Sequence, residues 1–144
     1  MIAIDTNVLL RYLLWDNKEQ SVKADRLING SVPVLITDVV LSETLWTLKG
    51  KKYKLDKAAI IDVVNSLFEE ANIRFEDGQT VWRALNDYRQ AEPVKVGGKK
   101  KEADFSDALI VNKAKFYAVE NGEALDGVYT FDLAAQAIPG TAKP

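Results

Sequence analysis

Short apolar runs alternate along the chain with longer segments in which apolar residues recur at helical spacing. The runs have the length and the flanking residues of buried strands, and they span residues 2–4, 34–36, 73–75 and 127–130. The longer segments predict helices with an apolar face, at about residues 8–14, 18–28, 38–48, 57–70, 79–90 and 105–120. Strands that alternate with amphipathic helices indicate an α/β domain with a mainly parallel sheet.

Two stretches show neither periodicity. Residues 93–101 contain two adjacent glycines and four lysines, and we predict an irregular loop there. A short helical turn is expected near residues 133–137, and the tail at residues 138–144 is predicted to be irregular. No linker or repeat divides the chain, so we predict one domain over residues 1–144.

The composition excludes several chemistries. The chain has no Cys and no His, which excludes thiolate nucleophiles, Cys-based zinc sites, Ser–His–Asp triads and imidazole ligands. Reactive groups would then be carboxylates, Lys, Tyr, Ser or Thr, or a metal held by oxygen. The net charge of −2 gives no basic-domain signature of nucleic-acid binding. No apolar run approaches the roughly 18 residues that span a bilayer and no secretory signal is visible, so we expect a cytoplasmic protein without membrane association.

Two carboxylates follow predicted strands. Asp5 comes directly after the first strand and Asp132 after the last. Ligands of parallel sheets bind beyond the carboxyl ends of the strands, so both positions favour a common site. Each Asp could instead cap the helix or turn that follows it, although Thr6 and Asn7 could also cap the first helix.

Glu43 stands among apolar residues of a predicted helix. Val39, Ser42, Glu43 and Trp46 share one stripe of that helix. A carboxylate in an apolar setting loses its hydration at a cost unless it is paired or bound to a metal, which favours a functional role. A solvated position at the rim of a site is the alternative.

Asp104 and Asp107 lie three residues apart at the start of another predicted helix. This spacing places both carboxylates on one side of the first turn. Acids at these positions also suit a capping box and the helix dipole. Like charges at this spacing repel each other unless a cation lies between them, which favours metal binding. Capping and metal binding therefore both stay open for Asp104 and Asp107.

Taken together, the acids predict a metal site. They occur at strand ends and near helix starts, which converge at one edge of a parallel sheet. Several carboxylates in one pocket would repel one another without a cation. Oxygen donors suit Mg²⁺ or Mn²⁺, and we expect one of these ions as the cofactor.

Four segments, taken in order and spacing, resemble a known family. They are IDTNVL at residues 4–9, LSE at 41–43, DFSDALI at 104–110 and YTFD at 129–132. The chain resembles PIN-domain ribonucleases and, more narrowly, the VapC-type toxins of type II toxin–antitoxin pairs. The resemblance covers the whole chain and implies a three-layer fold, with a mainly parallel central sheet flanked by helices.

The resemblance also implies roles for single residues. The metal-binding acids would be Asp5, Glu43, Asp107 and Asp132. Asp104 occupies a position that is acidic in some members, and it is a further catalytic candidate. The polar residues that support the acids would be Asn7, Ser42 and Thr130. Residues 133–137 contain no charged or aromatic side chain, whereas family members commonly have a basic or acidic-aromatic segment there.

The implied activity is hydrolysis of RNA phosphodiester bonds by a Mg²⁺- or Mn²⁺-dependent endoribonuclease. The implied partners are a VapB-like antitoxin and a second copy of the chain, and the dense apolar segment at residues 8–15 could serve either contact or the core. Lysines just before the Asp104 helix could grip RNA phosphates, or could belong to a solvated loop. These are Lys95, Lys99, Lys100 and Lys101.

Two other functions are compatible with parts of this pattern. A haloacid-dehalogenase-like phosphatase also places an Asp after its first strand, but its chemistry needs a second Asp two residues later, where this chain has Asn7. A non-catalytic PIN-like scaffold would bind RNA or protein only. Nothing in the sequence favours the scaffold, because all the acids are present.

Overall fold

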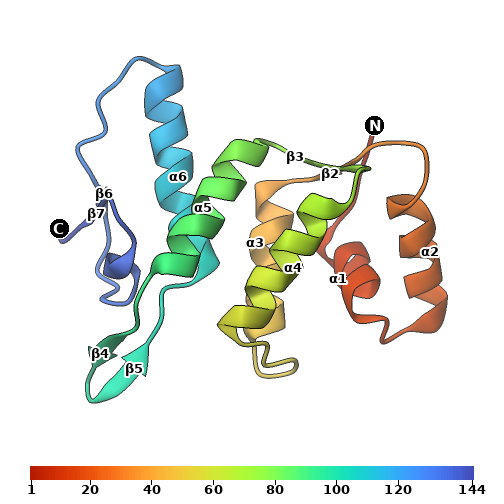
Figure 1. The fold of residues 1–144 in the computed structure, drawn as a ribbon, viewed down its shortest axis with the longest axis horizontal. Coiled ribbons are helices and arrows are strands. Elements are labelled where there is room, and N and C mark those ends of the chain that lie inside the picture. Colours follow the sequence, from red (N-terminus) through yellow and green to blue (C-terminus); the bar gives the residue numbers. More distant parts are fainter. The chain divides into compact units, whose positions relative to one another are not determined.

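The structure, a computed structural model, describes all 144 residues (Figure 1). The chain forms two compact units, unit 1 at Met1–Glu76 and unit 2 at Asp77–Pro144. Both contain helices and strands, and three of the four strand pairs are parallel, so the predicted α/β class is confirmed. None of the helices is long and apolar enough to cross a membrane.

Unit 1 contains a three-stranded parallel sheet. Its strands are β1 (Ile2–Ala3), β2 (Val34–Ile36) and β3 (Ile73–Phe75), and they lie in the order β1-β2-β3. Its helices are α1 (Thr6–Leu14), α2 (Lys18–Ile28), α3 (Asp38–Lys49) and α4 (Lys57–Glu69). The sheet thus joins three segments that are far apart in sequence, and every element predicted for this half is present.

Each helix of unit 1 begins at a polar side chain that accepts a hydrogen bond from a backbone N–H three residues later. The capping residues are Asp5, Asn17, Thr37 and Asp56. α1 ends at Trp15, which adopts the left-handed conformation with φ of 53°. The sequence signals for helix starts were therefore sound, and they place Asp5 firmly between β1 and α1.

The core of unit 1 forms from the apolar faces of these helices and of the sheet. Its fully buried side chains include Leu9, Ile28, Val34, Ile36, Leu41, Leu48 and Ile60. One buried polar group also joins two helices, because Ser21 of α2 donates through Oγ to the backbone carbonyl of Arg11 over 2.8 Å. This bond satisfies a buried hydroxyl and fixes α2 against α1.

Unit 2 is built on two packed helices, α5 (Gly78–Gln90) and α6 (Phe105–Glu120), which lie side by side in Figure 1. Tyr88 and Phe105 meet edge to face with ring centroids 6.0 Å apart. The buried amide of Asn112 donates to Asp87 Oδ2 over 2.8 Å, which links the two helices by a polar contact as well.

The segment predicted as an irregular loop is a β-hairpin, so that prediction was wrong. β4 (Val94–Val96) and β5 (Lys99–Lys101) pair in antiparallel fashion and extend beyond the ends of α5 and α6 (Figure 1). Gly97 and Gly98 have φ of 58° and 79°, the backbone that a two-residue turn of the I′ type requires and that glycine adopts without strain.

The tail was also expected to be irregular, and it is partly a strand. β7 (Thr141–Ala142) pairs in parallel with β6 (Val128–Tyr129). The predicted helical turn is present between them as a short 3₁₀ helix at Ala135–Ala137. The buried side chain of Ile138 anchors this return of the chain.

Tyr12 of α1 generates a pH-dependent prediction. Its hydroxyl donates to Glu70 Oε1 over 2.9 Å, and burial together with this bond raises the pKa of Tyr12 to about 12. The unfolded chain, with a tyrosine pKa near the ordinary value of about 10, loses this proton first. The stability gained from neutral Tyr12 is therefore complete below about pH 10 and is lost as the pH rises towards 12.

We therefore expect the free energy of unfolding of Tyr12→Phe to fall less steeply between pH 10 and 12 than that of the wild type. Urea unfolding at a series of pH values measures this slope. Tyr117→Phe removes an exposed phenol and serves as the control. Equal slopes for wild type and Tyr12→Phe would contradict the assignment.

Candidate functional site

Asp5 and Glu43 are joined around the start of α1. Asp5 Oδ1 accepts a hydrogen bond from the Val8 N–H over 2.9 Å, which confirms that Asp5 caps the helix. The next residue, Thr6, donates its hydroxyl to Glu43 Oε2 on α3 over 2.6 Å. Both acids are exposed, so water or an ion has access to them. Glu43 is thus hydrogen-bonded to the residue that follows Asp5 in the chain.

The polar residues expected to support these acids lie beside them in sequence and in space. Asn7 is exposed on the first turn of α1 and lines a cavity between α1 and α2. Ser42 is half-buried on α3 and directly precedes Glu43. Their supporting role stays a prediction.

The prediction that Glu43 lies in buried apolar surroundings was wrong. Val39 and Trp46, which share its stripe of α3, are 68% and 67% exposed, and Glu43 is exposed too. The buried stripe of α3 consists of Leu41, Thr44, Leu45 and Leu48. Desolvation therefore gives no reason to assign a function to Glu43, and its bond with Thr6 replaces that reason.

Asp104 and Asp107 form a capping box at the start of α6. Asp107 Oδ2 accepts a hydrogen bond from the Asp104 N–H over 2.8 Å. Both residues are half-buried. The capping alternative is therefore confirmed for this pair, and the bond fixes the Asp107 carboxylate on the first turn of α6.

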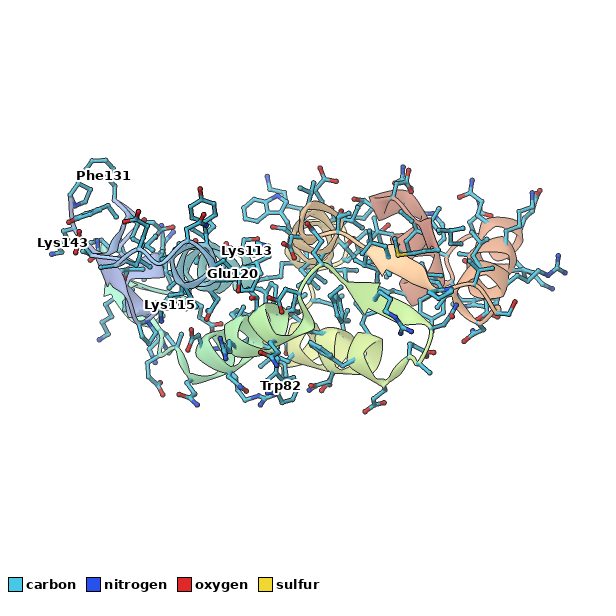
Figure 2. The ribbon with its side chains drawn as sticks, turned by 90° about the horizontal axis from the view of Figure 1, so that it is seen from above. Trp82, Lys113, Lys115, Glu120, Phe131 and Lys143 are labelled. Carbon is cyan, nitrogen blue, oxygen red and sulfur yellow. The ribbon has the colours of Figure 1, made fainter.

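Asp132 caps the turn that follows β6. Its Oδ1 accepts a hydrogen bond from the Ala134 N–H over 2.9 Å, and its own N–H donates to Thr130 Oγ1 over 3.0 Å. The neighbouring ring of Phe131 is 87% exposed and stands out from the ribbon (Figure 2). Thr130 thus contacts the backbone of Asp132, and its supporting role for the carboxylate stays a prediction; the exposed aromatic ring beside them was not foreseen.

The predicted acids are divided between the two units. Asp5 and Glu43 belong to unit 1, and Asp104, Asp107 and Asp132 belong to unit 2. Neither unit by itself gathers three or more acidic side chains into a group that could hold a metal ion. A single pocket shared by all these carboxylates stays a prediction.

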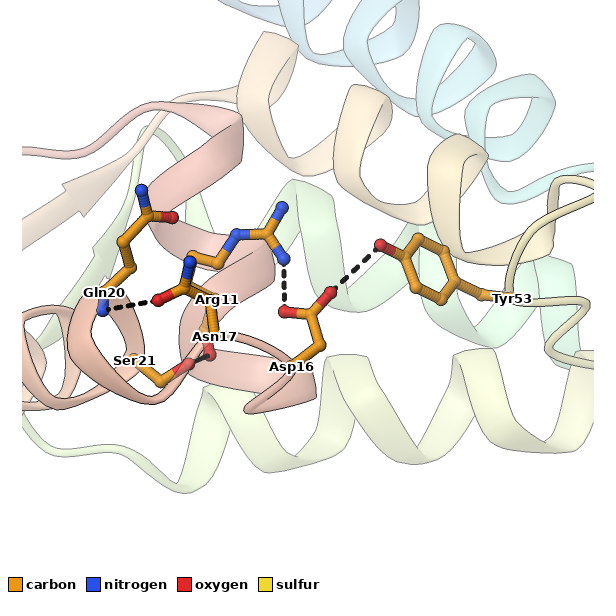
Figure 3. A network of polar contacts seen from close by, with 6 residues as sticks. All are labelled: Arg11, Asp16, Asn17, Gln20, Ser21 and Tyr53. Carbon is orange, nitrogen blue, oxygen red and sulfur yellow. Dashed lines mark hydrogen bonds and ion pairs between the residues drawn. The ribbon is translucent and has the colours of Figure 1, made fainter.

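Sequence reasoning overlooked the cations near Asp5. Arg11 and Lys23 line the same cavity as Asp5 and Asn7. Arg11 is fixed by Asp16, which also accepts a hydrogen bond from the Tyr53 hydroxyl over 3.3 Å (Figure 3). The bond with Arg11 lowers the pKa of the Asp16 carboxyl and raises that of the guanidinium.

The predicted RNA-binding lysines all lie on the hairpin of unit 2. All four are exposed, namely Lys95, Lys99, Lys100 and Lys101. Lys95 lies directly opposite Lys100 in the register, and Lys99 and Lys101 occupy the other face with Val94 and Val96. The hairpin therefore presents positive charge on both of its faces, and Glu102 and Ala103 connect it to the capping box.

A comparison with protein families decides the classification. The model of the PIN domain matches residues 2–136, which includes every predicted acid. The chain belongs to the PIN domain family. No curated protein matches it. Among solved structures it is similar to VapC20 of Mycobacterium tuberculosis, a toxin that cleaves the sarcin–ricin loop. The two sequences are 15% identical, and the match covers 95% of this chain and 94% of that chain with a TM-score of 0.40.

Membership of the PIN domain family confirms the resemblance of the four sequence segments. It also excludes the haloacid-dehalogenase alternative, which belongs to a different fold family. The matched region continues through both units, from β1 to the 3₁₀ helix after Asp132.

Two substitutions of Asp5 distinguish its role as a helix cap from a role in catalysis by this PIN domain. Asn accepts the Val8 N–H as Asp does, whereas Ala cannot. We expect Asp5→Ala to lower the free energy of unfolding by about 1 kcal/mol and Asp5→Asn to lower it by a few tenths at most. Urea unfolding measures both values. An equal loss in the two variants would show that the cap bond does not stabilise α1.

Proposed function

We propose that the protein is a metal-dependent endoribonuclease of the VapC type, the toxin of a type II toxin–antitoxin pair. The observation that carries this proposal is the link from Asp5 through Thr6 to Glu43, in a chain of the PIN domain family. A helix cap alone does not need Glu43. The bond from Thr6 brings Glu43 to the helix start that Asp5 caps, and two exposed carboxylates at one place favour a cation between them.

The donor set fits Mg²⁺ or Mn²⁺. We assign the ion to Asp5, Glu43, Asp107 and Asp132, with Asp104 as a further catalytic acid. These side chains offer hard oxygen donors, and the chain has no Cys or His that would favour a softer metal. In Asp5 and Glu43 the bonds described above occupy one carboxylate oxygen each. When bound, such an ion supplies an activated water and neutralises charge on the phosphate.

Hydrogen bonds within the chain orient the proposed metal-binding carboxylates. The Val8 N–H fixes Asp5, the Thr6 hydroxyl fixes Glu43, and the Asp104 N–H fixes Asp107. Carboxylates held in this way can order the attacking water without themselves acting as strong bases. Because hydrolysis then needs no imidazole or thiol, the lack of His and Cys is no obstacle.

The hairpin is assigned to RNA binding. Lys95 and Lys100 lie directly opposite each other, and like charges in such a pair destabilise a sheet. An anion between them relieves this repulsion, and RNA supplies a row of phosphates. The hairpin leads within three residues to Asp104, so bound phosphates would lie close to the capping box of unit 2.

The remaining parts of the proposal concern partners and location. A VapB-like antitoxin and a homodimer are proposed, in a protein that acts in the cytoplasm. Most of the apolar segment at residues 8–15 packs into unit 1, but Leu13 and Leu14 also line an apolar cavity of about 320 Å³, and Trp15 is 50% exposed. These residues supply surface for either partner.

Substitution of the acids tests the chemistry. We expect Asp5→Asn and Asp107→Asn to lower the rate of RNA cleavage by about 100-fold or more, because even outer partners of metal ligands contribute about 10- to 100-fold. Cleavage of mixed RNAs is followed with Mg²⁺ or Mn²⁺ and with a chelator. Asp126→Asn, an exposed acid outside the site, serves as the matched control.

Two results would count against this function. Wild-type cleavage by either Asn variant would remove the acids from the mechanism. RNA binding with no cleavage under any metal condition would favour the PIN-like scaffold instead.

Substitution of the hairpin lysines tests RNA binding. Replacement of Lys99, Lys100 and Lys101 by Gln should weaken RNA binding and reduce the slope of log K against log salt by about 2, since each phosphate contact on a single strand contributes about 0.7. The matched control replaces Lys51, Lys52 and Lys54, which removes the same charge from another loop. Fluorescence anisotropy at several salt concentrations gives both slopes. An unchanged slope for the hairpin variant would show that the hairpin does not contact phosphates.

A further inference from the structure

Unit 1 contains a cavity of about 380 Å³ between α1 and α2. Asp5 and Asn7 lie at the start of α1, Arg11 lies one turn further along, and Gln20 and Lys23 face them from α2. The volume is within the range of about 300–1,000 Å³ that small-molecule sites occupy. The cavity therefore lies beside one of the proposed metal-binding acids.

The lining combines an apolar wall, two side-chain amides, two cations and one carboxylate, that of Asp5. Val8, Ala24 and Leu27 provide an apolar wall. The side-chain amides of Asn7 and Gln20 make no hydrogen bond within the structure, so their donors and acceptors are available to a ligand. Apolar surface with a few converging polar groups is typical of a site for a small molecule.

The two cations of the cavity favour an anionic ligand. Lys23 forms only an exposed pair with Glu19, at 3.3 Å, and such pairs are weak enough to be replaced. Arg11 is oriented by Asp16, and Ser21 fixes its backbone carbonyl (Figure 3). Because Arg has five N–H donors, the bond with Asp16 leaves donors for a second anion.

We propose that this cavity binds one nucleotide of the RNA, next to the phosphodiester bond that is cleaved. The apolar wall contacts the base, the amides of Asn7 and Gln20 bind its edge, and Arg11 and Lys23 bind its phosphate. This inference rests on the proposed function for its reaction, but the site itself lies wholly within unit 1. The cavity thereby becomes a determinant of cleavage specificity.

Binding of nucleoside monophosphates to the full chain, in buffer with a chelator, tests the site without the reaction. We expect chemical-shift changes in the NMR spectrum at Asn7, Gln20 and Lys23, and binding of nucleosides about tenfold weaker than that of the matching monophosphates, since a charged hydrogen bond is lost. Gln20→Ala and Lys23→Gln should each weaken monophosphate binding by about tenfold. Lys18→Gln removes a lysine of α2 outside this cavity and should leave binding unchanged.

Three outcomes would overturn the proposal. They are the absence of shifts at the cavity residues, an equal loss of binding in Lys23→Gln and Lys18→Gln, and tighter binding of a glutamate-rich peptide than of any nucleotide. The last outcome would assign the cavity to an acidic protein segment.

A cleavage assay separates this proposal from the proposed function. Gln20→Ala should change which bonds are cut in a pool of RNAs while the chain still cleaves. If nucleotides bind in the cavity and the wild type cleaves no RNA, the nuclease proposal fails and the site stands. If the wild type cleaves RNA and Gln20→Ala neither alters the cleaved bonds nor weakens monophosphate binding, the site fails and the nuclease stands.

Discussion

The candidate site depends on hydrogen bonds from backbone N–H groups to carboxylates. Asp5, Asp107 and Asp132 each accept such a bond at the start of a helix or turn, from Val8, Asp104 and Ala134. Each bond holds its carboxylate in one orientation, at a position where backbone donors and the helix dipole suit an anion. Charge is thus fixed in place without being neutralised. This is what a site for a hard cation requires, because the ion must replace water and not a competing lysine or arginine.

Capping and metal binding are therefore compatible roles for these acids. The sequence alone left them as alternatives, and the structure confirms the caps. A carboxylate has two oxygens, and the bond from Val8 occupies only Oδ1 of Asp5. Glu43 differs from the others because it is in mid-helix, where no free backbone N–H is available, and a side-chain hydroxyl from Thr6 orients it instead. The site thus uses local bonds where the backbone offers them and one long-range bond where it does not.

The contrast between what the sequence predicted and what it missed follows the range of the interactions. Helix starts at Asp5, Asp56 and Asp104 were predictable because caps act within three or four residues. The hairpin was missed because four lysines hide the alternation of a strand, although Gly97 and Gly98 are a strong signal for a tight turn. The surroundings of Glu43 were misjudged because both stripes of α3 are apolar in sequence, and only packing against the core decides which of them is buried. The cavity beside Asp5 depends on how α2 docks on α1, which no local pattern encodes.

The hairpin carries charge of one sign only, unlike the helices α2 to α6, each of which carries both. The hairpin strands carry four lysines and no acid, and Glu92 precedes them while Glu102 follows. Two-stranded hairpins are only marginally stable alone, and the opposed pair Lys95–Lys100 lowers that stability further. Solubility does not require lysines to be paired across a hairpin, because lysines spread over the surface would provide the same charge without destabilising the hairpin. The phosphates of a polyanion would relieve the repulsion between the hairpin lysines, which is the physical ground for the proposed contact with RNA.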